Sequence, residues 1–121
     1  MNKQQALQKI EELKNYIKTL EKQEIKHEIP GKTIYWGEEA PERMDWYEAK
    51  EWCEEQGGRL PTRIELLYAY EDDIGGFSDG HYWSSSEYSS DFVWDQDFDY
   101  GGQFDRNKGH SHRVRCLRDK K

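Results

Sequence analysis

Asp95, Asp97 and Asp99 stand at alternate positions and have the residue type and spacing of a cation site. Residues two apart in a strand share a face, so these carboxylates could bind Ca²⁺ if a loop added further oxygen ligands. Acidic strand faces are more often exposed and paired with basic side chains, and Arg113 and Arg115 follow along the chain. We therefore expect an exposed acidic face without a bound metal.

His110 and His112 are also two apart and could both bind one metal ion. No nearby cysteine completes that ligand set, so we predict no metal site and no cofactor. Serines 84–86 lie close to His81 in the sequence, and these residue types occur in nucleophilic catalysis. The spacing of a nucleophile elbow is absent, and we therefore expect no catalytic residues.

The composition is that of one compact domain with an appendage. The 121 residues are 36% charged and 34% hydrophobic, but the 14% aromatic content, with five Trp, favours a core built from rings. The net charge of -7 argues against binding to nucleic acids or anionic membranes. Residues 71–105 hold ten Asp or Glu and no Lys or Arg, whereas 106–121 hold seven Lys or Arg, so we expect the two segments to pair.

The sequence contains no apolar run near the roughly 18 residues needed to cross a bilayer, so no membrane insertion is predicted. The N-terminal residues carry too many charges for a secretory signal peptide. We expect synthesis in the cytoplasm. The sequence does not indicate where the protein acts, and association with a virion is among the alternatives.

Apolar residues recur at steps of four and three near the N-terminus, which is the heptad spacing of a coiled coil. The pattern predicts an oligomerisation helix over residues 1–28, with a dimer or a trimer as the alternatives. An amphipathic helix packed on its own domain is a further alternative, because three heptads alone are marginally stable. The predicted seam consists of Ala6, Ile10, Leu13, Ile17 and Leu20.

Pro30 and Gly31 predict a hinge over residues 27–32, after which a second domain spans residues 33–118. This domain contains two helices with capping-box pairs, Asp45 with Glu48 and Thr62 with Glu65. We expect the first helix to bury Trp46, Ala49 and Cys53, and the second to bury Ile64, Leu67 and Tyr68.

Short strands are predicted elsewhere in this domain, from β-rich runs between turn residues. The layout is therefore α+β, with two helices followed by an antiparallel meander. The runs cover residues 33–36, 82–85, 92–98, 103–106 and 113–117.

Four runs in this domain carry a family resemblance: WYEAKEWC at 46–53, RLPTRIEL at 59–66, YWSSSE at 82–87 and RVRCLR at 113–118. They resemble the family typified by the C-terminal domain of collagen-like adhesins, found in phage and bacterial proteins. That family is a branch of the C-type-lectin-like fold. The resemblance covers about residues 33–118 and implies a C-type-lectin-like domain of two helices and antiparallel strands. The coiled-coil helix that the heptad pattern predicts lies outside the resemblance and precedes this domain.

In this fold, the first long helix and the last strand lie close together, and Cys53 and Cys116 fall on those two elements. The resemblance makes a disulfide plausible, with two reduced thiols as the alternative. Formylglycine-generating enzymes share the fold but need two active-site cysteines close together near the C-terminus, where this chain has only Cys116. We therefore expect no enzyme. The triplets used for calcium-dependent sugar binding are also missing, since residues 94–97 match only superficially.

Related variable proteins of retroelement and phage systems bind ligands on the face of the last hairpins. The resemblance implies a non-enzymatic recognition module for a cell-surface or host ligand, either glycan or protein. The coiled-coil pattern adds that two or three copies bind together. An intracellular phage-type protein that inhibits a host factor through its acidic face is the alternative, and an ordinary hydrophilic surface is a third interpretation. The candidate binding residues are Tyr88, Asp91, Asp95, Asp97, Asp99, Tyr100, Gln103, Asp105, Arg106, His110 and His112.

Overall fold

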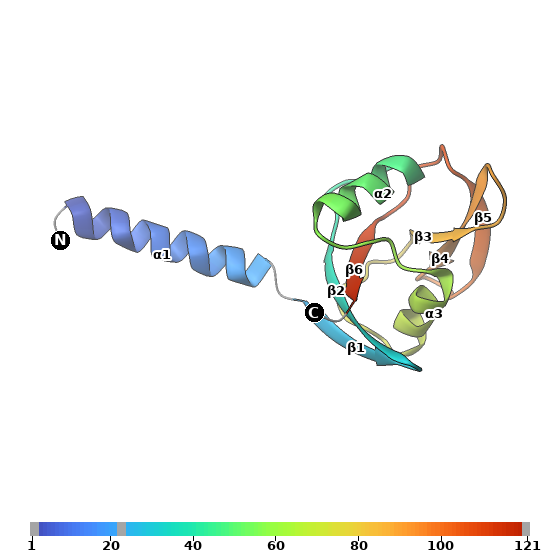
Figure 1. Cartoon of the computed structure of the whole chain (residues 1–121), viewed down its shortest axis with the longest axis horizontal. Coiled ribbons are helices and arrows are strands. Elements are labelled where there is room, and N and C mark those ends of the chain that lie inside the picture. The colour runs from blue at the N-terminus through green and yellow to red at the C-terminus, as the bar shows by residue number, and fades with distance from the viewer. Residues whose placement is uncertain (1–2, 22–23, 120–121) are drawn as a thin grey trace.

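The computed structural model describes residues 3–21 and 24–119, with the backbone alone described for residues 13–21. Within these ranges the fold is α+β, as predicted, with three helices and two antiparallel three-stranded sheets (Figure 1). The helices are α1 (Lys3–Glu21), α2 (Trp46–Glu55) and α3 (Arg63–Glu71). The strands are β1 (Ile25–Ile29), β2 (Lys32–Glu39), β3 (His81–Glu87), β4 (Phe92–Asp97), β5 (Gln103–Asn107) and β6 (Arg115–Asp119).

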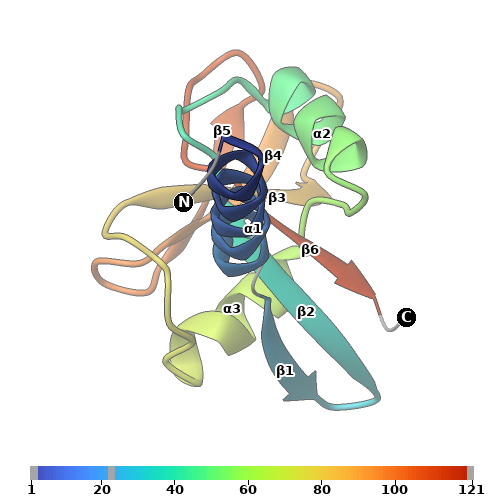
Figure 2. The same ribbon diagram turned by 90° about the vertical axis from the view of Figure 1, so that its left-hand side faces the viewer.

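Helix α1 extends away from the two sheets in Figure 1 and is seen end-on in Figure 2. The side chains of Leu7 and Ile10 are exposed, and Ala6 is half-buried. The side chains of Leu13, Ile17 and Leu20, which complete the predicted seam, lie outside the described residues. The helix therefore presents apolar groups to solvent, while a coiled-coil partner for it stays a prediction. Within the described ranges, no helix is both long and apolar enough to cross a membrane.

Residues 27–32 differ from the predicted hinge. They form the end of β1 and the β1–β2 turn, in which His27 pairs with Ile34 and Ile29 with Lys32. Gly31 has a φ of +84°, a conformation that suits glycine because it has no Cβ. The first sheet therefore begins at Ile25, earlier than the sequence pattern indicated.

The sheets have the strand orders β1-β2-β6 and β3-β4-β5. Strand β6 pairs with β2, so the last strand lies beside one of the first. Single bridges join Arg59 to Leu117 of β6 and Tyr82 of β3 to Arg113, two residues before β6. The Tyr82–Arg113 bridge thereby links β3 of the second sheet to the segment that leads into β6 of the first.

Helix α2 has the predicted capping box, in which Asp45 accepts a hydrogen bond from the backbone of Glu48. Its predicted stripe of Trp46, Ala49 and Cys53 is buried. These residues pack with Trp83, Val93 and Val114 in one of two core clusters. Cys53 and Cys116 are joined by a disulfide between α2 and β6 in this cluster, which is one of the two states that the sequence left open.

Helix α3 also has its capping box, but its buried face differs from the prediction. Ile64 is 60% exposed, whereas Glu65, Leu66 and Ala69 are buried. Leu66 and Ala69 pack with Ile34, Trp36, Tyr82 and Leu117 in the second core cluster. Periodicity placed the apolar face wrongly because a charged residue, Glu65, occupies a buried position on this helix.

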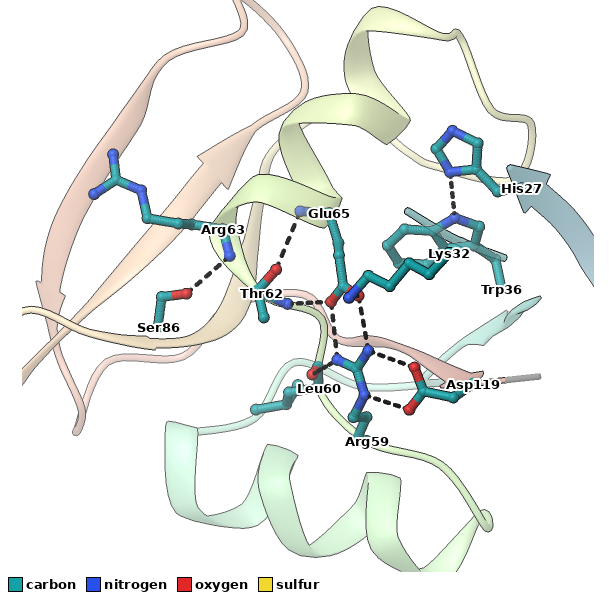
Figure 3. A network of polar contacts seen from close by, with 10 residues as sticks. All are labelled: His27, Lys32, Trp36, Arg59, Leu60, Thr62, Arg63, Glu65, Ser86 and Asp119. Carbon is teal, nitrogen blue, oxygen red and sulfur yellow. Dashed lines mark hydrogen bonds and ion pairs between the residues drawn. The ribbon is translucent and has the colours of Figure 1, made fainter. Parts of the chain in front are cut away.

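Glu65 is buried because four donors converge on its carboxylate (Figure 3). Arg59 donates through Nη1 at 2.8 Å and Nη2 at 2.7 Å, the backbone of Thr62 donates at 2.7 Å, and Lys32 Nζ lies 2.6 Å away. Arg59 also pairs with Asp119 through two hydrogen bonds of 2.9 Å. Burial alone would raise the pKa of Glu65, but these donors outweigh it and lower the pKa to about 2.

Candidate ligand-binding surface

The strand register divides the candidate residues of the last hairpins between two faces of one sheet. Trp94 lies opposite Asp105, and Gln96 lies opposite Gln103. Asp95 pairs with Phe104 one position along, and Val93 with Arg106, so their side chains point to the other face. The eleven candidates therefore do not form one continuous surface.

The acidic face predicted for β4 is not exposed at Asp95 and Asp97. Asp95 is 0% exposed and Asp97 is also buried, and the side chains of His81, Arg106 and His112 surround the Asp95 carboxylate. Arg113 pairs with Glu39, and Arg115 donates to the carbonyls of Gly37 and Gly75, so neither arginine pairs with the β4 carboxylates. The expected exposed face of three aspartates, paired with these arginines, is wrong.

The remaining candidates occupy the loops and the edge strand. Asp91, Asp99, Tyr100 and His110 are exposed, with Tyr100 in the turn between β4 and β5. The backbone of Asp99 donates to Asp97 Oδ1 at 2.8 Å, which gives the buried carboxylate of Asp97 a role in that turn. The predicted pairing of the acidic and basic segments occurs at Glu87–Lys108 and Asp95–Arg106.

On the first face, an aromatic group surrounds Trp94. The Tyr88 ring meets the Trp94 ring edge-on, with ring centres 5.5 Å apart. Phe92 lies two positions before Trp94 on the same face, and Tyr88 and Phe92 are 62% and 37% exposed. We call this region the Trp94 surface, and it comprises Arg63, Tyr88, Phe92, Trp94, Gln103 and Asp105.

Arg63 crosses to this surface from the first turn of α3. Its guanidinium carbon lies 3.7 Å from the centre of the Trp94 ring, the distance of a stacked cation–π contact. Its Nε donates to Gln103 Oε1 at 2.8 Å, and Gln103 in turn donates to the Arg63 carbonyl at 2.7 Å. The Trp94 surface is therefore held rigidly by contacts between α3, β4 and β5.

On the opposite face, three nitrogen groups surround the buried carboxylate of Asp95. His81 Nδ1 lies 3.0 Å from Asp95 Oδ2, Arg106 Nε lies 3.3 Å from the same oxygen, and His112 Nε2 lies 3.8 Å from it. Asp95 Oδ1 and His112 Nε2 have no hydrogen-bond partner among the described residues. Trp83 packs edge-on against His112, with ring centres 4.4 Å apart.

Burial controls the protonation of this cluster. It lowers the pKa of His112 to about 4, assisted by repulsion from His81, Arg106, His110 and Arg43. Burial also raises the pKa of Asp95, against the opposing influence of His81 and Arg106. His112 is therefore neutral at pH 7. Protonating it in acid would place a positive charge in a buried position and destabilise the folded state.

The described residues contain no metal site, but they do line a pocket. Nowhere in residues 3–21 and 24–119 do three His, Cys, Asp or Glu side chains form a group that could hold a metal ion. A pocket of about 410 Å³ lies beside the disulfide and is lined in part by Tyr35, Trp52, Cys116 and Arg118. The guanidinium of Arg118 stacks on Tyr35 and pairs with Glu24, so this charged group of the pocket lining already has partners.

The candidate residues predicted from the sequence do not include Arg63, Phe92 or Trp94. The alternation of Phe92 and Trp94 along the sequence indicates that the two residues share a face, but alternation does not indicate whether that face is exposed. The contact of Arg63 with Trp94 could not be predicted from the sequence, because Arg63 lies on a helix far from the hairpins along the chain.

The family model described as the Sulfatase-modifying factor enzyme 1-like domain (FGE-sulfatase) matches residues 6–119. This match overturns the assignment to the family of collagen-like adhesins, although the domain shares the C-type-lectin-like fold that the assignment implied. No curated protein matches the sequence. Since the matched region spans nearly the whole sequence, the chain belongs to the family of Sulfatase-modifying factor enzyme 1-like domains.

Proposed function

We propose that this protein is a non-enzymatic recognition module that binds a glycan or protein ligand at the Trp94 surface. The observation that carries the proposal is the exposure of Tyr88 and Phe92 beside Trp94, whose ring is held by Arg63. Aromatic side chains provide contact area at low entropic cost, and the neighbouring Asp105 and Gln103 supply hydrogen-bonding groups. Such a mixture is typical of recognition surfaces.

A binding role is favoured over catalysis by the state of the cysteines. The family includes enzymes and non-enzymes, so membership alone decides nothing. Formylglycine-generating enzymes use two neighbouring cysteines for chemistry, whereas the two cysteines of this sequence form the Cys53–Cys116 disulfide in the core. With both sulfurs bonded to each other, neither is available as a nucleophile.

Inhibition of a host factor through an acidic face is the alternative to this proposal. It is based on the acidic segment 71–105, of which Asp95 and Asp97 are buried, whereas Asp91, Asp99 and Asp105 are exposed. The proposal at the Trp94 surface is favoured because the acidic face is smaller than the sequence predicts.

The recognition module is proposed to be oligomeric through α1. The heptad pattern and the exposed Leu7 and Ile10 support this, because an isolated helix gains stability by burying its apolar seam against a second copy. Two or three copies would strengthen weak contacts to a repetitive surface by avidity.

The binding proposal is tested on a glycan array and a panel of cell-surface protein extracts. We expect the wild-type protein to bind, and Trp94→Ala to reduce the binding at least tenfold. Tyr47→Ala serves as the control, because Tyr47 on α2 is an aromatic residue outside the Trp94 surface and is as exposed as Tyr88. Equal binding by wild type and Trp94→Ala, or no binding by the wild type in either assay, would refute the proposal.

Oligomerisation is tested separately by sedimentation of the full chain. We expect Ile10→Asp to convert a dimer or trimer into a monomer, because a charge in the seam must be desolvated. Gln8→Asp, on the outer side of the heptad, should leave the mass unchanged. A wild-type protein that sediments as a monomer at about 50 μM would contradict this part.

A further inference from the structure

Arg63 is fixed in place more tightly than a surface arginine requires. Its backbone N–H donates to Ser86 Oγ at 3.0 Å, its Nε is bound to Gln103, and its guanidinium plane rests on Trp94. Figure 3 shows the side chain directed away from the Glu65 network, although Arg63 and Glu65 belong to the same helical turn. Arg63 thus takes no part in that network of ion pairs.

The terminal nitrogens of Arg63 are available. No described residue accepts a hydrogen bond from its Nη1 or Nη2, and no described carboxylate lies within ion-pair distance. Three other arginines of the domain are paired with acids: Arg59 with Glu65 and Asp119, Arg113 with Glu39, and Arg118 with Glu24. Arg63 therefore offers a pre-oriented pair of donors at an exposed aromatic surface.

A guanidinium with two free parallel N–H groups matches the geometry of a carboxylate, which it binds through two hydrogen bonds. Holding the fork in advance reduces the entropy lost on binding. The overall charge of -7 disfavours anions in general, so preference for an acidic ligand must come from this local group. Arg63 is therefore the residue of the Trp94 surface that would bind the carboxylate of a ligand.

The neighbours of Arg63 define the rest of the ligand. The exposed rings of Tyr88 and Phe92 offer flat apolar surfaces, which suit the C–H face of a sugar ring. Asp105 lies opposite Trp94 on β5, is exposed, and can accept hydrogen bonds from hydroxyl groups. We propose that the ligand is an acidic saccharide, whose carboxylate pairs with Arg63 while its sugar rings pack on Tyr88 and Phe92. This inference rests on the proposed function at the Trp94 surface.

The test uses two pairs of probes that differ in their carboxylates: trigalacturonic acid with galactotriose, and sialyllactose with lactose. The full chain, labelled with ¹⁵N in its tryptophan indoles, is titrated with each probe and followed by NMR. We expect at least one acidic probe to move the Trp94 indole signal and to bind at least about tenfold more tightly than its neutral counterpart, the effect of one charged hydrogen-bonded pair.

Arg63→Lys keeps the charge but loses the planar fork, and we expect it to weaken binding of the acidic probe about tenfold. Arg43→Lys is the matched control, since Arg43 is exposed and its substitution should leave the affinity unchanged. Unchanged affinity in Arg63→Lys would overturn the inference.

The other outcomes separate this inference from the proposed function. Equal binding of neutral and acidic probes would overturn the acidic ligand and leave recognition at Trp94 intact. Binding of a tri-glutamate peptide as tight as that of the acidic sugars would assign the site to acidic peptides and overturn the saccharide. Failure of both acidic probes to bind would also overturn the inference, while the array with Trp94→Ala judges the proposed function independently.

Discussion

The guanidinium of Arg63 and the ring of Trp94 lie 3.7 Å apart, and this contact joins α3 to the middle strand of the β3-β4-β5 sheet. Arg63 thereby shields one face of Trp94, while Tyr88 meets the same ring edge-on. Helix α3 and strand β4 therefore contribute to one surface through the contact of Arg63 with Trp94.

Arg63→Ala should uncover Trp94 with little loss of stability. An exposed cation–π contact is worth about 0.5–1 kcal/mol, so we expect the free energy of unfolding in urea to fall by no more than about 1 kcal/mol. The indole N–H signal of Trp94 should shift most among the five tryptophans. An unmoved Trp94 signal would show that the two side chains are not stacked in solution.

Replacing both cysteines by alanine should destabilise the domain strongly. The Cys53–Cys116 disulfide spans 63 residues, and closing a loop of that size stabilises the folded state by about 4 kcal/mol in the chain-entropy model. Urea unfolding of wild type and variant measures the difference. Dithiothreitol should lower the stability of the wild type and leave the variant unchanged. Two alkylated cysteines in unfolded, unreduced wild type would contradict the bond itself.

Glu65→Gln should cost about 3 kcal/mol at pH 7, since the pKa of Glu65 falls from an ordinary 4.5 to about 2 on folding. The folded state favours the ionised carboxyl, so this stabilisation is present above pH 4.5 and is lost as the pH falls towards 2. Urea unfolding at several pH values should show a flatter acid dependence for Glu65→Gln than for wild type.

Glu71→Gln provides the control for that experiment, because Glu71 is exposed on the same helix. Its acid dependence should follow the wild type. Similar curves for Glu65→Gln and Glu71→Gln would mean that the donors around Glu65 do not stabilise its charge.

His112→Phe should make the domain more resistant to mild acid. Burial lowers the pKa of His112 from 6.5 to about 4, so the unfolded chain takes up a proton first and stability falls as the pH drops from 6.5 towards 4. The loss should reach about 3 kcal/mol in wild type and be absent in the variant. Phenylalanine preserves the ring packed on Trp83.

Asp95, whose raised pKa acts in the opposite direction over part of this range, is present in both proteins, so the comparison isolates His112. His110→Gln removes an exposed histidine and should retain the wild-type acid sensitivity. Identical pH dependence of wild type and His112→Phe would show that His112 is not buried as a neutral ring.

Local sequence signals predicted α2 well. Asp45 and Glu48 form its capping box, and Trp46, Ala49 and Cys53 form its buried stripe. Both features depend on residues within a few positions of one another, so the sequence contains the necessary information. The α+β layout followed from the same kind of signal.

The buried face of α3 could not be predicted in this way. Glu65 is buried because Arg59, Lys32 and the backbone of Thr62 donate to its carboxylate, and Lys32 comes from β2, far from α3 in the sequence. Ile64 is exposed beside it. A pattern of apolar residues cannot reveal partners brought from other elements.

The sequence alone determined which residues of β4 share a face, since alternation is a property of every strand. Only the tertiary structure decided which faces are covered. Side chains from β3, from β5 and from the segment before β6 bury Asp95, whereas Arg63 of α3 stacks on Trp94 on the other face of β4. Backbone periodicity is local, but burial and the meeting of side chains depend on how distant elements pack.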